Sequence, residues 1–159
     1  MEKIQKTNVM RILAQSKIPY LAHPYDTSEL DAVHAADSIG VPRARLFKTL
    51  VTQAADGGHA VFLVPSDATL DLKRAARAAA VKSVCMLPQK QLLPLTGYVH
   101  GGCSPIGMKK CFPTFVDESA AAFDSILFSA GRIGLMVEVS PKDLCALIGA
   151  SYAPLIFQT

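Results

Sequence analysis

The densest group of potentially reactive residues lies in one segment, residues 98–110. Its sequence is YVHGGCSPIGMKK, with three glycines, a proline, a thiol, a histidine and two lysines. Glycine lets the backbone turn through positive φ or approach a ligand closely, and proline fixes the exit of a turn. We therefore predict a binding loop, although an ordinary long connection has the same local composition.

Two patterns in this segment suggest specific chemistry. Cys103 follows His100 closely and could act as a nucleophile with a base, but no third group in the sequence orients His100. A buried or loop-lining thiol is the alternative that we favour. The stretch Gly102–Lys109 superficially matches a phosphate-binding P-loop, but its lysine is displaced by one position and no Ser or Thr follows. We predict no nucleotide hydrolysis, only N–H groups and lysines that could hold a carbonyl oxygen or a phosphate.

Lys48 is the second candidate and lies in a predicted strand, residues 46–52. Side chains alternate along a strand, so Leu46, Lys48 and Leu50 share one face. A lysine among such neighbours is either a gatekeeper on an edge strand, which the strand alone favours, or a side chain at the rim of a pocket. The residues by themselves leave both interpretations open.

The elements that must position these residues are hairpins and helices in mixed order. Helical periodicity and capping residues predict helices at 7–16, 28–39, 71–80, 118–123 and 140–148, with one helical turn at 42–45 and one or two at 88–95. Apolar runs bounded by turn residues predict strands at 18–23, 46–52, 60–64, 81–86, 111–116, 125–130 and 135–139. Because strict βαβ alternation is missing, we predict one α+β domain, 1–159, with a largely antiparallel or mixed sheet.

The composition excludes several classes of protein. The 159 residues are 50% apolar and 18% charged, which is typical of a chain with a real core rather than a disordered one. No apolar run approaches the ~20 residues that a bilayer requires. The N-terminal sequence lacks the apolar core and cleavage site of a secretory signal, so we expect a cytoplasmic protein without membrane association.

The cysteines and the charge give weaker indications. The four cysteines show no C-x-x-C spacing and the four histidines no zinc-motif spacing, so we predict no metal site. The net charge of +3 suggests an anionic partner only if the basic residues cluster. Lys73, Arg74 and Arg77 form such a side on one predicted helix; it is either a solvated face or an RNA-facing stripe.

Four motifs in chain order resemble the YbaK family. They are FKTL at 47–50, GGCSPIG at 101–107, GxxGL at 131–135 and PxDL at 141–144, and the resemblance extends from Tyr20 to Pro154. Members of this family are free-standing relatives of the editing domain inserted in bacterial prolyl-tRNA synthetases. The pattern is most similar to the Cys-tRNA(Pro) deacylase branch.

The resemblance implies a compact α+β fold around a strongly curved mixed sheet. It also implies hydrolysis of the ester that joins a wrong amino acid to the tRNA 3′ end, with no metal or cofactor. The family's central lysine corresponds to Lys48, and backbone donors near Gly101 and Gly102 would stabilise an oxyanion, at about 3 kcal/mol per well-placed donor. The implied substrate contacts are Tyr20, Thr49, Ser104, Pro105 and Ser129. Some relatives carry a polar residue where this chain has Met136.

The resemblance also implies a mechanism and a partner. In the Cys-specific branch the substrate's own thiol attacks its carbonyl, so the protein supplies placement and charge rather than a base. Contacts with tRNA phosphates are expected at Arg43, Arg45, Lys73, Arg74, Arg77, Lys109 and Lys110. A prolyl-tRNA synthetase is the partner expected to supply tRNA identity. The alternatives are a deacylase of the same fold for Ala- or Ser-charged tRNA, and a non-catalytic module that binds tRNA or the synthetase.

Overall fold

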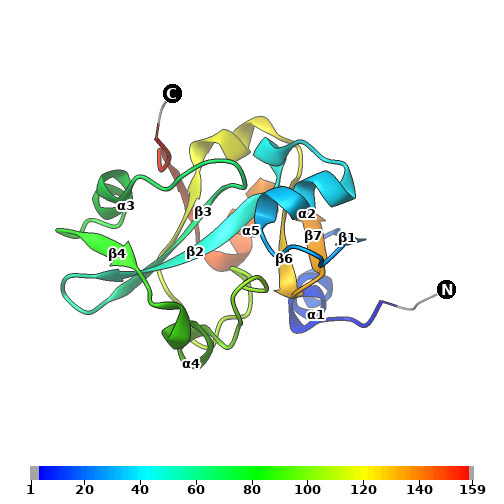
Figure 1. Cartoon of the computed structure of the whole chain (residues 1–159), viewed down its shortest axis with the longest axis horizontal. Helices are drawn as coiled ribbons and strands as arrows, with labels where there is room; N and C mark the ends of the chain where they lie inside the picture. The colour runs from blue at the N-terminus through cyan, green and yellow to red at the C-terminus, as the bar shows by residue number, and fades with distance from the viewer. Residues whose placement is uncertain (1–3, 158–159) are drawn as a thin grey trace.

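Residues 4–157, the part of the chain that the computed structural model describes, contain two sheets, one of three strands and one of five (Figure 1). The smaller sheet is antiparallel with the order β1-β7-β6, and it comprises β1 (Leu21–Pro24), β6 (Ile126–Arg132) and β7 (Leu135–Val139). The larger sheet has the order β4-β2-β3-β5-β8. It comprises β2 (Phe47–Ala54), β3 (His59–Pro65), β4 (Val84–Met86), β5 (Thr114–Asp117) and β8 (Ser151–Ala153).

The larger sheet is mixed. β2 pairs antiparallel with β3 and β4, whereas β5 pairs parallel with β3 and β8. The predicted α+β class with a mixed, largely antiparallel arrangement is therefore confirmed. What was expected as one curved sheet is divided in two, because β2 and β6 are bridged only once, between Leu46 and Leu127.

Three of the α-helices have as their N-cap the first residue of a predicted helical range, 7–16, 71–80 or 140–148. Thr7, Asp71 and Ser140 each accept an amide hydrogen bond from the first turn of a helix. The helices that they cap are α1 (Asn8–Gln15), α3 (Leu72–Ala78) and α5 (Pro141–Ile148). The remaining helical segments are α2 (Ala32–Ile39), α4 (Leu92–Thr96) and the 3₁₀ turns η1 (Arg43–Arg45), η2 (Gln89–Gln91) and η3 (Glu118–Ala122).

The start of α2 differs from the prediction. The pattern at 28–31 predicts a capping box begun by Ser28, but Asp31 is the N-cap, and its Oδ1 accepts the amide of His34 at 2.6 Å. Ser28 instead donates from its hydroxyl to Oδ2 of Asp26 at 2.8 Å, which stabilises a turn before the helix. The segment 25–31 is thus a loop that leads from β1 into α2.

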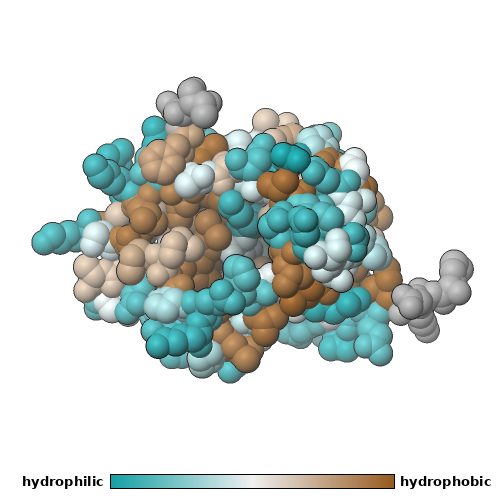
Figure 2. Space-filling view, viewed as in Figure 1, coloured by the Kyte–Doolittle hydropathy of each residue, from teal (hydrophilic) through white to brown (hydrophobic). Residues whose placement is uncertain are grey.

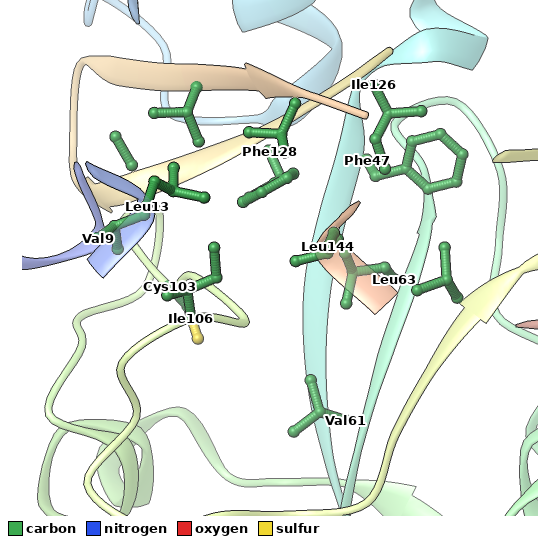
Figure 3. Packing of buried hydrophobic residues seen from close by; sticks show 14 of the residues in the cluster. Val9, Leu13, Phe47, Val61, Leu63, Cys103, Ile106, Ile126, Phe128 and Leu144 are labelled. Atoms are coloured by element: carbon green, nitrogen blue, oxygen red, sulfur yellow. The ribbon is translucent and has the colours of Figure 1, made fainter. Parts of the chain in front are cut away.

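The buried apolar residues form three hydrophobic clusters. The largest takes residues from both sheets and from α1 and α5, and Phe47, Phe128 and Leu144 are fully buried in it (Figure 3). A second cluster packs α3 on the larger sheet. In the third, Ala35 and Ala36 of α2 pack with both residues of the bridge between the sheets. This packing fixes α2 over the junction of the sheets, next to the cavity described below.

Candidate active site

A cavity of about 720 Å³ opens where β2 separates from its neighbours. One edge of β2 is paired with β3 along its length. On the other edge, β6 is bridged at Leu46 and β4 pairs only from Thr52 onward. The strand between these two contacts lines the cavity. The other walls come from the loop before α2, the β4–α4 connection, the glycine loop, β6 and β7.

The rim of the cavity is largely apolar. Figure 2 shows apolar residues gathered over the β2 and β4 part of one face of the molecule. Leu30 and Met86, both on the cavity wall, keep 48% and 44% of their surface exposed. Such exposed apolar groups beside a cavity suit a ligand with a flat apolar part, such as a nucleobase.

Lys48 projects from β2 into this space. It is half-buried, and its Nζ donates to the carbonyl oxygen of Ser66 at 3.4 Å. Desolvation lowers the pKa of Lys48, and the nearby Asp67 carboxylate opposes that shift. At Lys48 one edge of β2 is unpaired, because β4 pairs only from Thr52 onward, but the side chain lines the cavity rather than acting as the gatekeeper of an open sheet edge. Lys48 is instead a cation of the cavity wall.

Two hydroxyl-bearing residues among the predicted substrate contacts also line the cavity. Oγ1 of Thr49 is buried and has no hydrogen-bond partner among residues 4–157. Ser129 is 6% exposed, and its hydroxyl accepts the amide of Gly131 at 3.1 Å. The Thr49 oxygen is closed to solvent and carries the free-energy cost of an unpaired buried hydroxyl, so Thr49 contributes to the cavity wall through its other atoms.

The two glycines of the predicted oxyanion site have different roles. Gly101 lines the cavity with φ +88, a conformation that favours glycine. Gly102 is buried, and a Cβ there would lie 3.0 Å from the backbone nitrogen of Ile133. The amide of Gly102 already donates to the carbonyl of Val99 at 3.0 Å, so this glycine serves loop packing. Over the described residues, the amides of Gly101 and Cys103 donate to no other group.

The thiol of Cys103 lies on the cavity wall but is not activated. It is 9% exposed, and burial raises its pKa to about 12. A thiol is nucleophilic as its thiolate, so a raised pKa makes a catalytic role unfavourable. This agrees with the loop-lining alternative for Cys103. His100 contributes to the same wall, and its ring makes no hydrogen bond to the described chain.

Three predicted substrate contacts do not line the cavity. Ser104 is fully buried, and its hydroxyl accepts the amide of Ile106 at 3.3 Å. Pro105 is buried beside it, so both residues shape the glycine loop from inside. Tyr20 precedes β1 and packs partly buried against the main core. Tyr25, after β1, lines the cavity instead, and no motif in the sequence distinguishes it.

None of the seven predicted tRNA contacts lines the cavity, and all except Arg45 fall into two groups. Arg43 forms a bidentate pair with Asp37, at 3.0 and 2.7 Å, and Arg74 lies 3.5 Å from Asp71. The others, Lys73, Arg77, Lys109 and Lys110, are exposed and form no ion pair within the described chain.

Arg45 differs from the other basic residues because it points into the structure. It pairs with Glu138 and donates to the carbonyl and hydroxyl of Ser125, at 3.0 and 2.7 Å. His23 lies 2.8 Å from the other oxygen of Glu138, and these contacts lower the pKa of Glu138 against the effect of burial. Arg45 therefore links η1 to the smaller sheet through these contacts. Its side chain is engaged inside the structure, which does not fit the prediction that it contacts tRNA.

No group of three or more His, Cys, Asp or Glu side chains within residues 4–157 is arranged to hold a metal ion. Within the same residues, no helix has the length and apolar character needed to cross a membrane.

Comparison with known proteins identifies the family. The family model described as the aminoacyl-tRNA editing domain matches residues 27–147. The chain is 44% identical over 151 residues to EbsC of Enterococcus faecalis, which carries the provisional name of a Cys-tRNA(Pro)/Cys-tRNA(Cys) deacylase; the match covers 94% of this chain and 92% of EbsC. It is also 28% identical to YwhH of Bacillus subtilis, an uncharacterised protein, over 76% of each chain.

Solved structures show the same fold. The hypothetical protein APE2540 superposes with a TM-score of 0.86 at 22% identity, covering 94% of this chain and 99% of that one. A protein described provisionally as a trans-editing enzyme for prolyl-tRNA synthetase has a TM-score of 0.81 at 24% identity, covering 96% and 99%. The chain belongs to the aminoacyl-tRNA editing family, and the predicted family and fold are confirmed. It is thus an enzyme of the deacylase class, which cleaves the ester between an amino acid and tRNA.

Proposed function

We propose that this deacylase removes cysteine from mischarged tRNA(Pro), and that the substrate thiol performs the attack. The observation that carries the proposal is a cavity with a cation and unused backbone amides but no activated protein nucleophile. The similarity to EbsC, whose provisional name specifies Cys-tRNA(Pro) and Cys-tRNA(Cys), supports the choice of amino acid.

The proposed reaction has two steps. The cysteinyl sulfur attacks its own ester carbonyl, the carbon–oxygen bond to the ribose breaks, and the thiol proton passes to the departing ribose oxygen. The products are free tRNA and a cyclic thiolactone, which water then opens to cysteine. Because nucleophile and electrophile belong to one molecule, the protein has to hold them in a reactive geometry rather than activate a residue of its own.

The wall residues supply the remaining requirements of this reaction. The amides of Gly101 and Cys103 are the donors proposed for the oxyanion that forms on the carbonyl. Lys48 would attract the anionic transition state or a terminal phosphate, since its ammonium is partly withdrawn from water. Thr49 and Ser129 would contact the aminoacyl group.

A panel of charged tRNAs tests this function. Purified protein is incubated with Cys-, Ala-, Ser- and Pro-tRNA(Pro), and loss of the ester is followed against a protein-free control. Preferential loss of the cysteinyl ester is expected. Preference for the alanyl or seryl ester would establish the same-fold alternative, and no acceleration on any ester would leave only a non-catalytic binding module.

The tRNA itself is proposed to be selected with the help of prolyl-tRNA synthetase in the cytoplasm. A net charge of +3 offers limited capacity to discriminate among RNAs. If the synthetase supplies this selection, its addition should raise the preference for tRNA(Pro) over tRNA(Cys) charged with cysteine. An unchanged preference would show that selection resides in this chain alone.

A further inference from the structure

The wall of the cavity carries one carboxylate within the described chain, that of Asp31, and no role assigned above uses it. The other wall residues are apolar, neutral polar or basic. The cavity thus holds an anion, Asp31, and a cation, Lys48, on separate elements, the start of α2 and the middle of β2. A ligand that fits this space should carry both a positive and a negative or electron-rich group.

Only one of the two oxygens of the Asp31 carboxylate takes part in capping the helix. Oδ1 accepts the amide of His34 at 2.6 Å, which fixes the side chain at the start of the helix. Over residues 4–157, Oδ2 accepts no hydrogen bond, and Asp31 forms no ion pair. One oxygen of an oriented carboxylate is therefore available to a ligand.

An aminoacyl ester has a group that matches this oxygen. Its α-ammonium lies one bond from the carbon that bears the scissile carbonyl, and an ammonium donates its strongest hydrogen bonds to carboxylates; Asp31 is exposed at the cavity wall and offers such an oxygen. We propose that Asp31 binds the α-ammonium of the substrate and so restricts the cavity to esters with a free amino group. This inference rests on the proposed deacylase function. It adds that esters with an acylated amino group are excluded from the cavity.

The exclusion follows from the chemistry of N-acylated esters. Peptidyl and formylated aminoacyl esters have no positive charge at this nitrogen and add a carbonyl oxygen next to it. The remaining amide N–H is a neutral donor, so the charge-assisted part of the hydrogen bond to the Asp31 carboxylate is lost. The hydroxyl of Ser129 is neutral, so it could accept a hydrogen bond without distinguishing the two kinds of ester. Asp31 is consequently a positioning residue that selects the substrate class.

Binding of two uncleavable analogues tests the inference independently of turnover. The probes are 3′-cysteinylamino-3′-deoxyadenosine, in which an amide replaces the ester, and its N-acetyl derivative, each titrated calorimetrically in the presence of a thiol reductant. The wild type should bind the free amine about tenfold more tightly than the N-acetyl form, as expected for a charged hydrogen bond. Asp31→Asn should bind the two within about threefold, through weaker binding of the free amine alone, and Asn caps helices as well as Asp does.

Two variants make the outcome decisive. Asp31→Ser also keeps a capping side chain and should show the same loss of discrimination. Asp71→Asn removes the same charge from the N-cap of α3, away from the cavity, and should keep the wild-type ratio. If Asp31→Asn keeps the wild-type ratio, or if the wild type binds the two analogues equally or not at all, the inference is wrong. Because the analogues are not cleaved, failure of the deacylation panel with an intact binding ratio would overturn only the proposed function.

Discussion

At the scale of single residues, Lys48 is the cation of the cavity wall. It is half-buried, and its pKa is lowered mainly by desolvation. A partly desolvated ammonium interacts more strongly with an incoming anion than a solvated one does. The charge of Lys48 is thus available to a ligand and is engaged only by a long contact to Ser66.

Replacement of Lys48 by alanine should reduce deacylation and leave the fold intact. Loss of a charged group that stabilises the transition state typically lowers kcat about 100-fold. The rate on cysteinyl-tRNA and the far-UV circular dichroism spectrum are the two measurements. Lys82→Ala, an exposed lysine off the cavity wall, is the matched control and should retain the wild-type rate. Full activity of Lys48→Ala would refute the role proposed for this lysine.

Replacement of Cys103 by serine should be tolerated. The thiol has a pKa raised to about 12, so it contributes no nucleophile whose removal could stop the reaction. The deacylation rate should stay within about threefold of the wild type, which is the range of a modest packing change. A folded but inactive Cys103→Ser enzyme would revive the model in which the protein supplies the nucleophile.

At the scale of elements, the glycine loop and β6–β7 turn must approach each other closely to form one wall. Gly102 is the point of contact, since a Cβ there would lie within 3.0–3.2 Å of the backbone of Arg132 and Ile133. Backbone atoms cannot rotate away as a flexible side chain can. Glycine is therefore needed at 102 because a side chain has no room there, and not because the backbone adopts a positive φ.

Alanine at position 102 should therefore destabilise the protein. We expect a loss of about 1–3 kcal/mol in the free energy of unfolding, as is usual for overpacking. Urea denaturation measures it. Gly58→Ala is the control, because its close neighbour is the carboxylate of Asp56 at 3.1 Å, which can move. Equal stability of the two variants would show that the loop yields easily at Gly102.

Local patterns in the sequence predicted most of the helices and strands. The site depends on contacts between residues far apart in the sequence, and these could not be predicted in the same way. The caps at Thr7, Asp71 and Ser140 act within one helical turn, so the sequence reveals them. The start of α2 was misplaced because Ser28 and Asp31 are both good caps, and Asp26 bonds the first of them. The local patterns could not decide between two such neighbours.

The cavity wall was predictable only where a motif marked it. Lys48, Thr49, Gly101 and Ser129 were expected from the motifs, and all four line the cavity. Its other walls, including Tyr25, come from segments brought together by the pairing of two sheets. Nothing within such a segment encodes its neighbours, so a residue like Tyr25 has no sequence signal of its own.

At the scale of the whole molecule, the exposed basic residues lie outside the cavity and would contact the body of a bound tRNA. Lys73 and Arg77 on α3 are exposed and unpaired within the described chain, whereas Arg43, Arg45 and Arg74 already face carboxylates. Contacts with phosphates release counterions, so they appear as a dependence of binding on salt. Replacement of a cavity residue should therefore affect the chemical step, whereas replacement of an exposed basic residue should affect tRNA binding and its salt dependence.

The double variant Lys73→Ala/Arg77→Ala should bind tRNA more weakly with kcat unchanged. Loss of two phosphate contacts should reduce the slope of log Kd against log salt by about 1.5. Binding of deacylated tRNA over a range of salt concentrations measures that slope. Lys82→Ala/Lys142→Ala removes the same charge from two other exposed lysines and is the control. Identical slopes for both double variants would assign α3 to a merely solvated face.

The most direct measurement compares the hydrolysis of Cys-tRNA(Pro) and Ser-tRNA(Pro) by the same enzyme. The two esters differ only in the sulfur or oxygen of one side chain, so the comparison isolates the nucleophile proposed for the reaction. A hydroxyl is far less ionised than a thiol at neutral pH. The account predicts rapid loss of the cysteinyl ester and little acceleration on the seryl ester. Equal rates on the two esters would contradict it, because the substrate sulfur would then have no part in the cleavage.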